Sequence, residues 1–301
     1  MVTDISIINE LAKRYERVQN LFKFVNYDNL YKAISKIDGT KASGVDEKTK
    51  EEYLINVKEN LENLVKRIMH GHYQPLPSKR VYIPKANGKK RPLGIPSFED
   101  KIVQVVIREM LEELFEWRFL NCSYGFRPGR NCHQAIQEVA ALIQTKKVNY
   151  VCDIDIKGFF DNVNHEWMIK ALKYRIDDKK FVGLIEKFLE AGIMEDGNYY
   201  ETEKGTPQGG IISPILSNIY LHYVLDLWFE KKRKEYKGEA YLVRYADDFV
   251  CMFQYHSEAT EFYKELNQRV SDFGLELSQE KSKIIEFGRF ASRNRKRRGV
   301  P

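Results

Sequence analysis

The chain has 301 residues, of which 43% are hydrophobic and 31% are charged, a composition typical of a globular protein rather than a disordered or collagen-like one. With 49 Lys and Arg residues against 43 Asp and Glu residues, its formal net charge is +6. No apolar run reaches the ~18 residues that cross a membrane, so we expect no membrane association. The 4 Cys residues lack CxxC spacing, which argues against a zinc knuckle or a disulfide framework. A reducing bacterial cytoplasm, or alternatively an organelle, is the expected setting.

The positive charge is concentrated in two blocks. Residues 79–91 and residues 289–298 each carry six basic side chains and no acidic one. Blocks of one sign repel themselves unless a polyanion binds them, so a nucleic acid is the expected partner. For the second block, a solvated chain end is an equally good interpretation.

In the first half of the chain, apolar residues recur at helical spacing over 5–25, 47–70, 99–120 and 131–144. Asp46 and Asn131 are the expected caps of the second and fourth of these helices. Between the second and third helices, residues 81–96 are β-like on both sides of Asn87-Gly88, which predicts a hairpin.

In the second half, a strand is predicted over 150–156 and two helices over 163–191, followed by a hairpin turn at Asp196-Gly197. Ser213-Pro214 is typical of the start of a helix, which we expect to be long. An apolar run over 241–253, a helix after Ser257 and short strands over 275–279 and 283–288 complete the pattern. Strands separated by helices and hairpins predict an α+β domain with a small mixed or antiparallel sheet.

Two adjacent carboxylates, Asp247 and Asp248, interrupt the apolar run over 241–253. Neighbours in a continuous strand point to opposite faces, which would bury one of these charges. A tight hairpin at this point instead presents both acids at one edge. The alternative is an ordinary acidic turn.

The strand over 150–156 carries Asp153 and Asp155 on one face, while its other face is apolar. Such a strand is either a carboxylate platform or a half-exposed edge strand with solvated acids. If it lies in the same small sheet as Asp247 and Asp248, the acids repel each other unless a cation neutralises them. Hard oxygen ligands favour Mg²⁺, and two such ions ~3.5–4 Å apart support phosphoryl transfer.

A Gly-rich segment over 205–214 leads into the helix predicted at Ser213-Pro214. Its amides could approach an anion or a base closely. It lacks the Gly-Lys-Ser/Thr of a P-loop, and a plain connector is the alternative.

Several further segments occur in a characteristic order. They are 38–46 (DGTKASGVD), 82–96 (YIPK through RPLGIP), 124–130 (YGFRPGR), 206–210 (TPQGG) and 245–248 (YADD). Together they resemble the reverse transcriptases encoded by group II introns.

This resemblance implies a right-hand polymerase fold of the α+β class, with fingers and a palm whose small antiparallel sheet packs on helices. We expect an N-terminal helical extension over 1–75 and fingers over 76–150. The palm is expected over 151–290, with 163–210 contributing to the fingers. Residues 291–301 are expected to be a basic tail at the truncated start of an absent thumb.

The resemblance also implies roles for individual residues. The catalytic and metal-binding set is Asp155, Asp247 and Asp248 with the carbonyl of Ile156, and Asp153 is the same-face alternative to Asp155. The nucleotide-binding residues are Lys85, Arg91, Phe160, Gln208 and Gly209. Phe160 would crowd the sugar 2′ position, or alternatively be a core residue beside Phe159. Lys281 would be the general acid that protonates pyrophosphate, although Lys283 is close by.

The implied activity is RNA-directed DNA polymerisation with two Mg²⁺ ions, together with maturase binding of the intron RNA. The expected partners are intron RNA, an RNA template with a DNA primer, deoxynucleoside triphosphates and a second copy of the chain. RNA contacts are expected at Lys13, Arg14, Lys23, Lys79 and Arg80. The alternatives are an RNA-binding splicing cofactor with little polymerase activity and a retron-like reverse transcriptase.

Overall fold

The computed structural model describes residues 4–84, 88, 90–206, 209–288 and 291–298. The chain forms two compact units, each assembled from two stretches of sequence. The first unit comprises Met1–Trp117 and Phe160–Leu216, and the second comprises Arg118–Phe159 and Ser217–Pro301.

The first unit combines a four-stranded sheet with helices. Its strand order is β2-β1-β4-β5, in which β1 and β4 are parallel and the other neighbours are antiparallel. The strands are β1 (Ser78–Pro84), β2 (Lys90–Ile95), β4 (Ile193–Glu195) and β5 (Asn198–Tyr200). The helices are α1 (Ile7–Arg14), η1 (Phe22–Phe24), α2 (Tyr27–Ser35), α3 (Lys50–Ile55), α4 (Val57–Met69), α5 (Phe98–Phe115), α8 (His165–Lys173) and α9 (Lys179–Leu189).

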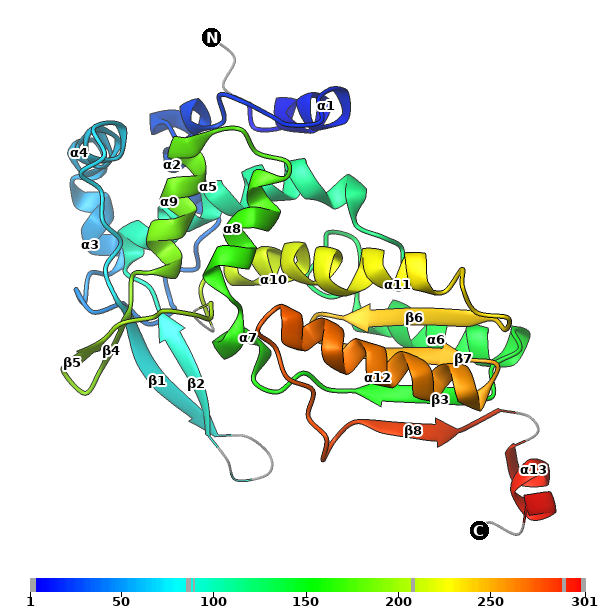
Figure 1. Ribbon diagram of the computed structural model, residues 1–301. Coiled ribbons are helices and arrows are strands. Elements are labelled where there is room, and N and C mark those ends of the chain that lie inside the picture. Colours follow the sequence, from blue (N-terminus) through cyan, green and yellow to red (C-terminus); the bar gives the residue numbers. More distant parts are fainter. Residues whose placement is uncertain (1–3, 85–87, 89, 207–208, 289–290, 299–301) are drawn as a thin grey trace. The chain divides into compact units, whose positions relative to one another are not determined.

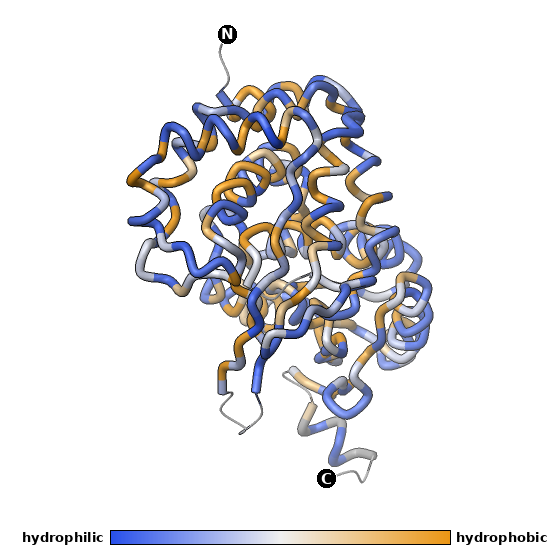
Figure 2. The backbone as a smooth tube through the Cα atoms, turned by 90° about the vertical axis from the view of Figure 1, so that its left-hand side faces the viewer, coloured by the Kyte–Doolittle hydropathy of each residue, from blue (hydrophilic) through white to orange (hydrophobic). Residues whose placement is uncertain are grey.

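Helix α5 forms the core of the first unit. Ser97 caps it by accepting a hydrogen bond from the backbone N–H of Asp100. Ile102, Val106 and Met110 are fully buried, and α1 and α2 pack against this helix. Each such side chain contributes about 1.5–3 kcal/mol on burial. Figure 2 shows hydrophobic and hydrophilic stretches alternating along the helices, as expected of helices that bury one side.

The second unit contains an antiparallel sheet with the order β6-β7-β3-β8 (Figure 1). Its strands are β3 (Tyr150–Ile154), β6 (Ala240–Tyr245), β7 (Asp248–Phe253) and β8 (Lys283–Glu286). Its helical elements are α6 (Cys132–Thr145), the π-helical η3 (His222–Asp226), α11 (Leu227–Lys232), α12 (His256–Asp272) and α13 (Ala291–Arg298). The elements η2 (Glu116–Arg118), α7 (Phe159–Asn162) and α10 (Ser213–Leu221) each contain a boundary between the two units in the sequence.

Helices cover both faces of this second sheet. On one face, α6 packs through Ala135 and Leu142 against Val243 and Met252. On the other face, α12 contacts β3 and β7, and the Cys152 thiol reaches the carbonyl of a residue in α12. The side-chain alternation of the strands therefore directs Asp155 and Asp248 to the α6 face.

The α+β class and most of the predicted elements are confirmed. The hairpin turn at Asp196-Gly197 joins β4 to β5, and Asn131 caps α6 with a capping box. The residues flanking Asn87 pair as β1 and β2. The acidic pair lies at the turn between β6 and β7, as expected.

The helix predicted over 5–25 is wrong beyond Arg14. The guanidinium of Arg175 donates to the carbonyls of Ala12 at 2.6 Å and Tyr15 at 3.0 Å, and Val18 pairs with Ile176 in a β-bridge. These tertiary partners take the backbone groups that a continuing helix would use.

Asp46 is not the cap of the helix predicted over 47–70. Thr49 and Glu52 form a capping box instead, so α3 begins at Lys50. Asn56, at φ −120° and ψ 41°, then separates α3 from α4.

The long helix predicted from Ser213 is confirmed, and it passes through π-helical geometry over His222–Asp226 before it continues as α11. One prediction in the second half needs correction. Residues 275–279 do not form a regular strand, because only Leu277 pairs, in an isolated bridge with Ile156.

In the part of the chain that the structure describes, every helix is too short or too polar to cross a membrane. The division into an extension, fingers, palm and tail stays a prediction.

Candidate active site

The second unit brings Asp155 and Asp248 together at one edge of its sheet. Strand β3 pairs with β7 so that Ile154 lies opposite Phe249. Asp155 follows Ile154, and Asp248 precedes Phe249, so the antiparallel register places the two Asp residues opposite each other. They come from sequence positions 93 residues apart, and both project to the same face.

The electrostatics of this edge reflect the proximity of the acids. Partial desolvation raises the pKa of Asp248, as do the negative charge of Asp155 and, to a smaller extent, that of Asp153, while Lys281 lowers it. The Lys281 ammonium lies 3.1 Å from both carboxylate oxygens of Asp155. The protein therefore already places one cationic group on this carboxylate pair.

Asp247 sits in the turn between β6 and β7, where Ala246 adopts a left-handed conformation with φ 58°. Among the residues described, no three Asp, Glu, His or Cys side chains lie close enough together to hold a metal ion. The donor chemistry nevertheless fits Mg²⁺, because two carboxylates, which are hard oxygen ligands, face each other. A bound cation would also lower the electrostatic cost of ionising Asp248.

The two acids between which the sequence left the choice open have different neighbours in the structure. Asp153 lies opposite Val250 rather than Asp248, and opposite Lys283 on β8. Asp155, by contrast, contacts Lys281. The pair formed by Asp155 and Lys281 is thus the one adjacent to the acidic turn.

Buried polar residues outside the predicted site residues support this turn. Arg244, at the end of β6, is fully buried and binds the fully buried Asp226. Asn218 on α10 also contacts the Arg244 guanidinium. The signal was present in the sequence, because Asn218 and Asp226 are polar residues within an otherwise apolar stretch.

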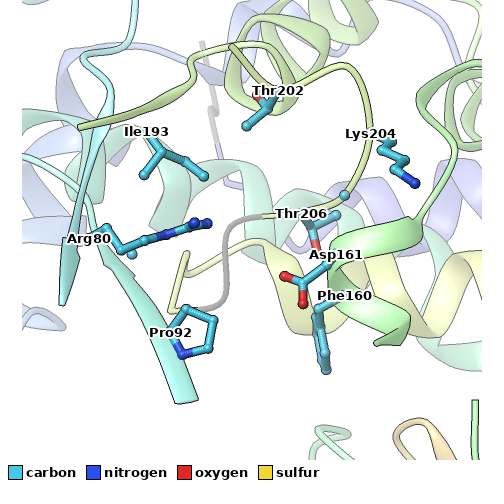
Figure 3. A pocket seen from close by; sticks show the side chains of 10 residues that line it. Arg80, Pro92, Phe160, Asp161, Ile193, Thr202, Lys204 and Thr206 are labelled. Atoms are coloured by element: carbon cyan, nitrogen blue, oxygen red, sulfur yellow. The ribbon is translucent and has the colours of Figure 1, made fainter. Parts of the chain in front are cut away.

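The first unit contains a cavity of about 230 Å³ that Phe160 helps to line. In Figure 3, Arg80 from β1 and Asp161 from α7 point toward one another across this cavity. Thr206 lines it as well, and the Thr206 residue is buried. Phe160 is half-buried, whereas Phe159 is the fully buried member of the pair.

Arg91 and Gly209, two further predicted nucleotide-binding residues, lie in the first unit. Arg91 is exposed on β2, opposite Ile83. Gly209 has φ 105°, and a Cβ there would lie 2.5 Å from the carbonyl oxygen of Gly94, so only Gly fits. Lys85 and Gln208 lie outside the described residues.

The predicted RNA-binding residues differ in their surroundings. Lys13, Arg14 and Lys23 are exposed. Lys79 and Arg80 are half-buried, and each has an acidic neighbour: Lys79 lies 3.9 Å from Glu47, and Arg80 lies 3.6 Å from Glu195.

A comparison with protein families matches residues 83–298 to the family described as reverse transcriptase (RNA-dependent DNA polymerase). The chain is 34% identical to Protein YkfC of Escherichia coli, over 89% of this chain and 80% of that protein. It is 40% identical to the group II intron-encoded protein LtrA of Lactococcus lactis, over 68% of this chain and 33% of LtrA. It is 35% identical to an uncharacterized 91 kDa protein in the cob intron of Schizosaccharomyces pombe, over 77% of this chain and 30% of that protein. The chain thus spans four fifths of one relative and about a third of the other two.

Proposed function

Since the chain belongs to the reverse transcriptase family and is similar to its group II intron-encoded members, we propose that the sheet edge of its second unit is the polymerase active site. The reaction would be RNA-directed DNA synthesis, in which a primer 3′-hydroxyl attacks the α-phosphate of a deoxynucleoside triphosphate. The observation that carries this proposal is the pairing of Ile154 with Phe249 on adjacent strands, which sets Asp155 and Asp248 side by side so that the charge of one raises the pKa of the other.

Asp155, Asp247 and Asp248 are the residues that would hold two Mg²⁺ ions, with the carbonyl of Ile156 as a further oxygen donor. Bound Mg²⁺ would activate the attacking hydroxyl and neutralise charge on the phosphates. The carboxylates of Asp155 and Asp248 would supply the negative charge that a cation needs, and the pairing of β3 with β7 would keep them close together. Asp247 would extend this donor set from the turn.

Lys281 would have two roles at this edge. Before metal and nucleotide bind, its ammonium neutralises Asp155. Once displaced toward the departing pyrophosphate, it would donate a proton to the leaving oxygen as a general acid. The Lys281 side chain is 68% exposed, which leaves it room to move between these positions.

The first unit would bind the incoming nucleotide. Lys85 and Arg91 would hold the triphosphate, since their cationic side chains pair with phosphate oxygens. Gln208 and Gly209 would line the pocket for the nucleotide base. The absence of a side chain at Gly209 permits the close approach of its backbone to Gly94. Phe160 would exclude a 2′-hydroxyl from the sugar and so select deoxynucleotides.

The arrangement would be that of polymerase fingers and palm. The partners we propose are intron RNA, an RNA template with a DNA primer, and deoxynucleoside triphosphates. A bacterial cytoplasm is the proposed location, because YkfC and LtrA come from bacteria. Self-association of the chain stays a prediction.

The direct experiment is extension of a DNA primer annealed to RNA, with Mg²⁺ and deoxynucleotides. The wild-type chain should extend the primer, and Asp247→Ala should abolish extension while RNA affinity stays within ~2-fold, since phosphate contacts dominate that affinity. Extension by the variant at the wild-type rate would refute the metal assignment.

A second function, binding of intron RNA to assist splicing, is favoured by the exposed Lys13, Arg14 and Lys23. Similarity to a nuclear intron maturase of Arabidopsis thaliana, 35% identical over 32% of this chain, points the same way. Tight and salt-sensitive binding of intron RNA without nucleotide incorporation would make this the principal function.

A further inference from the structure

A fully buried polar cluster, formed by Asn218, Asp226 and Arg244, lies beneath the acidic turn of the second unit. Arg244 donates from Nε to Asp226 Oδ1 at 2.8 Å and from Nη2 to Asp226 Oδ2 at 2.6 Å. Its remaining nitrogen, Nη1, donates to Asn218 Oδ1 at 3.0 Å and to the carbonyl oxygen of Ala246 at 2.9 Å. The guanidinium thus binds two side chains and the backbone of the turn at once.

The turn needs such support because Ala246 adopts φ 58°, a conformation that a residue with a Cβ rarely holds. The Gly125 backbone packs directly against the turn, since a Cβ at Gly125 would lie 2.2 Å from the Ala246 nitrogen. Asn218 Nδ2 donates to the Gly125 carbonyl at 2.8 Å, so the polar cluster also holds this neighbouring backbone. The next two residues of the chain after Ala246 are the acids Asp247 and Asp248.

Stability alone does not explain this cluster. A buried ion pair loses so much hydration that replacing both partners with apolar residues is often neutral or stabilising. A guanidinium becomes useful here because its fixed fork can hold a carboxylate and a backbone carbonyl together. Asp226 also ends the π-helical stretch, a distortion that is frequent at functional sites.

We propose that Arg244 is a positioning residue, held by Asp226 and Asn218, that fixes the turn so that Asp247 and Asp248 present their carboxylates for metal binding. This inference rests on the proposed function of the same site. A displacement of ~1 Å in a catalytic group can cost ~100-fold in rate, so a loosened turn should impair catalysis strongly.

The main test replaces both buried charges, in the double variant Arg244→Met with Asp226→Leu. We expect a folded protein whose thermal melting lies near that of wild type. Backbone amides of residues 245–248 should exchange hydrogen ~10-fold faster, as expected of a loosened segment. Binding of Tb³⁺, followed by its luminescence sensitised by the neighbouring Tyr245, should need a higher metal concentration in the double variant than in wild type. Primer extension should also need more Mg²⁺ and be ~100-fold slower.

Asn218→Ala is the second variant, because it leaves the ion pair intact and removes the hydrogen bonds that Asn218 makes with Arg244 and Gly125. It should shift the same measurements in the same direction by smaller factors. The control is Leu266→Ala in α12, a fully buried residue whose loss should lower the melting temperature without changing exchange at 245–248 or the Tb³⁺ titration.

Unchanged exchange and Tb³⁺ titration in a folded double variant would overturn the proposal. Failure of both the double variant and Asn218→Ala to fold would also overturn it, since the cluster would then be a folding element. If the wild-type chain does not extend primers at all, the proposed function fails, while the exchange and Tb³⁺ measurements still decide the positioning role.

Discussion

Replacing Lys281 with Gln removes the cation that contacts Asp155 and should tighten Mg²⁺ binding. Its ammonium lies 3.1 Å from an Asp155 oxygen, and the two side chains are 68% and 28% exposed. An ion pair this exposed contributes ~1 kcal/mol or less to stability, so the free energy of unfolding should hardly change.

The effect on metal binding follows from Coulomb's law. Two unit charges ~4 Å apart interact by ~1 kcal/mol in water and ~4 kcal/mol near a protein surface. We use the lower of these two interaction energies because the Lys281 side chain is mostly exposed. Without the Lys281 ammonium, Mg²⁺ no longer competes against an interaction of ~1–1.4 kcal/mol for Asp155, which corresponds to Mg²⁺ binding that is ~5–10-fold tighter. The difference should shrink as added salt screens the pair.

The assay is single-turnover primer extension titrated with Mg²⁺. Lys281→Gln should lower the half-saturating Mg²⁺ concentration yet also lower the rate at saturation by ~100-fold, the typical contribution of a general acid. Lys283→Gln is the matched control, since Lys283 is also exposed but lies opposite Asp153. An unchanged Mg²⁺ dependence in Lys281→Gln, or the same response in Lys283→Gln, would refute the reasoning.

Three further predictions concern the first unit. Phe160→Val should raise ribonucleotide use relative to deoxynucleotide use by ~10–100-fold in single-nucleotide incorporation, and equal discrimination would exclude the proposed role of Phe160. Burial raises the pKa of Asp100 from 3.8 to about 6, against the hydrogen bonds that it accepts from neighbouring groups. The folded state therefore holds this proton more tightly than the unfolded state, so stability should fall by up to ~3 kcal/mol as the pH rises through this range. Urea unfolding should show this slope in wild type and a flatter one in Asp100→Asn, and equal slopes would contradict it. Changing Lys13, Arg14 and Lys23 together to Ala should make RNA binding less sensitive to salt. The negative slope of log RNA affinity against log salt should become shallower by roughly 2, and an unchanged slope would place the RNA contacts elsewhere.

Local sequence patterns predicted the elements of the proposed active-site edge because these depend on short-range rules. The alternation of apolar residues and acids identified the strand that carries Asp155, and the interrupted apolar run located the turn with Asp247 and Asp248. The family comparison confirms the resemblance to group II intron reverse transcriptases that the motifs indicated. Neither step required knowledge of distant contacts.

Tertiary partners decided what the sequence did not reveal. The helix predicted over 5–25 ends early because Arg175, far along the chain, binds its last carbonyls. The support of the turn depends on Arg244 meeting Asp226 and Asn218, residues 18 and 26 positions away. The neighbours of Asp153 and Asp155 depend on the register of β3 against β7, which local patterns do not predict because both residues lie on the same face.

The most direct test of the account compares two neighbouring substitutions, Asp155→Asn and Asp153→Asn, in single-turnover extension of a DNA primer on RNA at saturating Mg²⁺. Both remove one negative charge from the same face of β3, but only Asp155 lies beside Asp248. We expect Asp155→Asn to slow extension by at least ~100-fold, because a carboxylate that would hold the catalytic Mg²⁺ is lost. Asp153→Asn should extend the primer at nearly the wild-type rate. Wild-type extension by Asp155→Asn, or loss of extension only in Asp153→Asn, would contradict it.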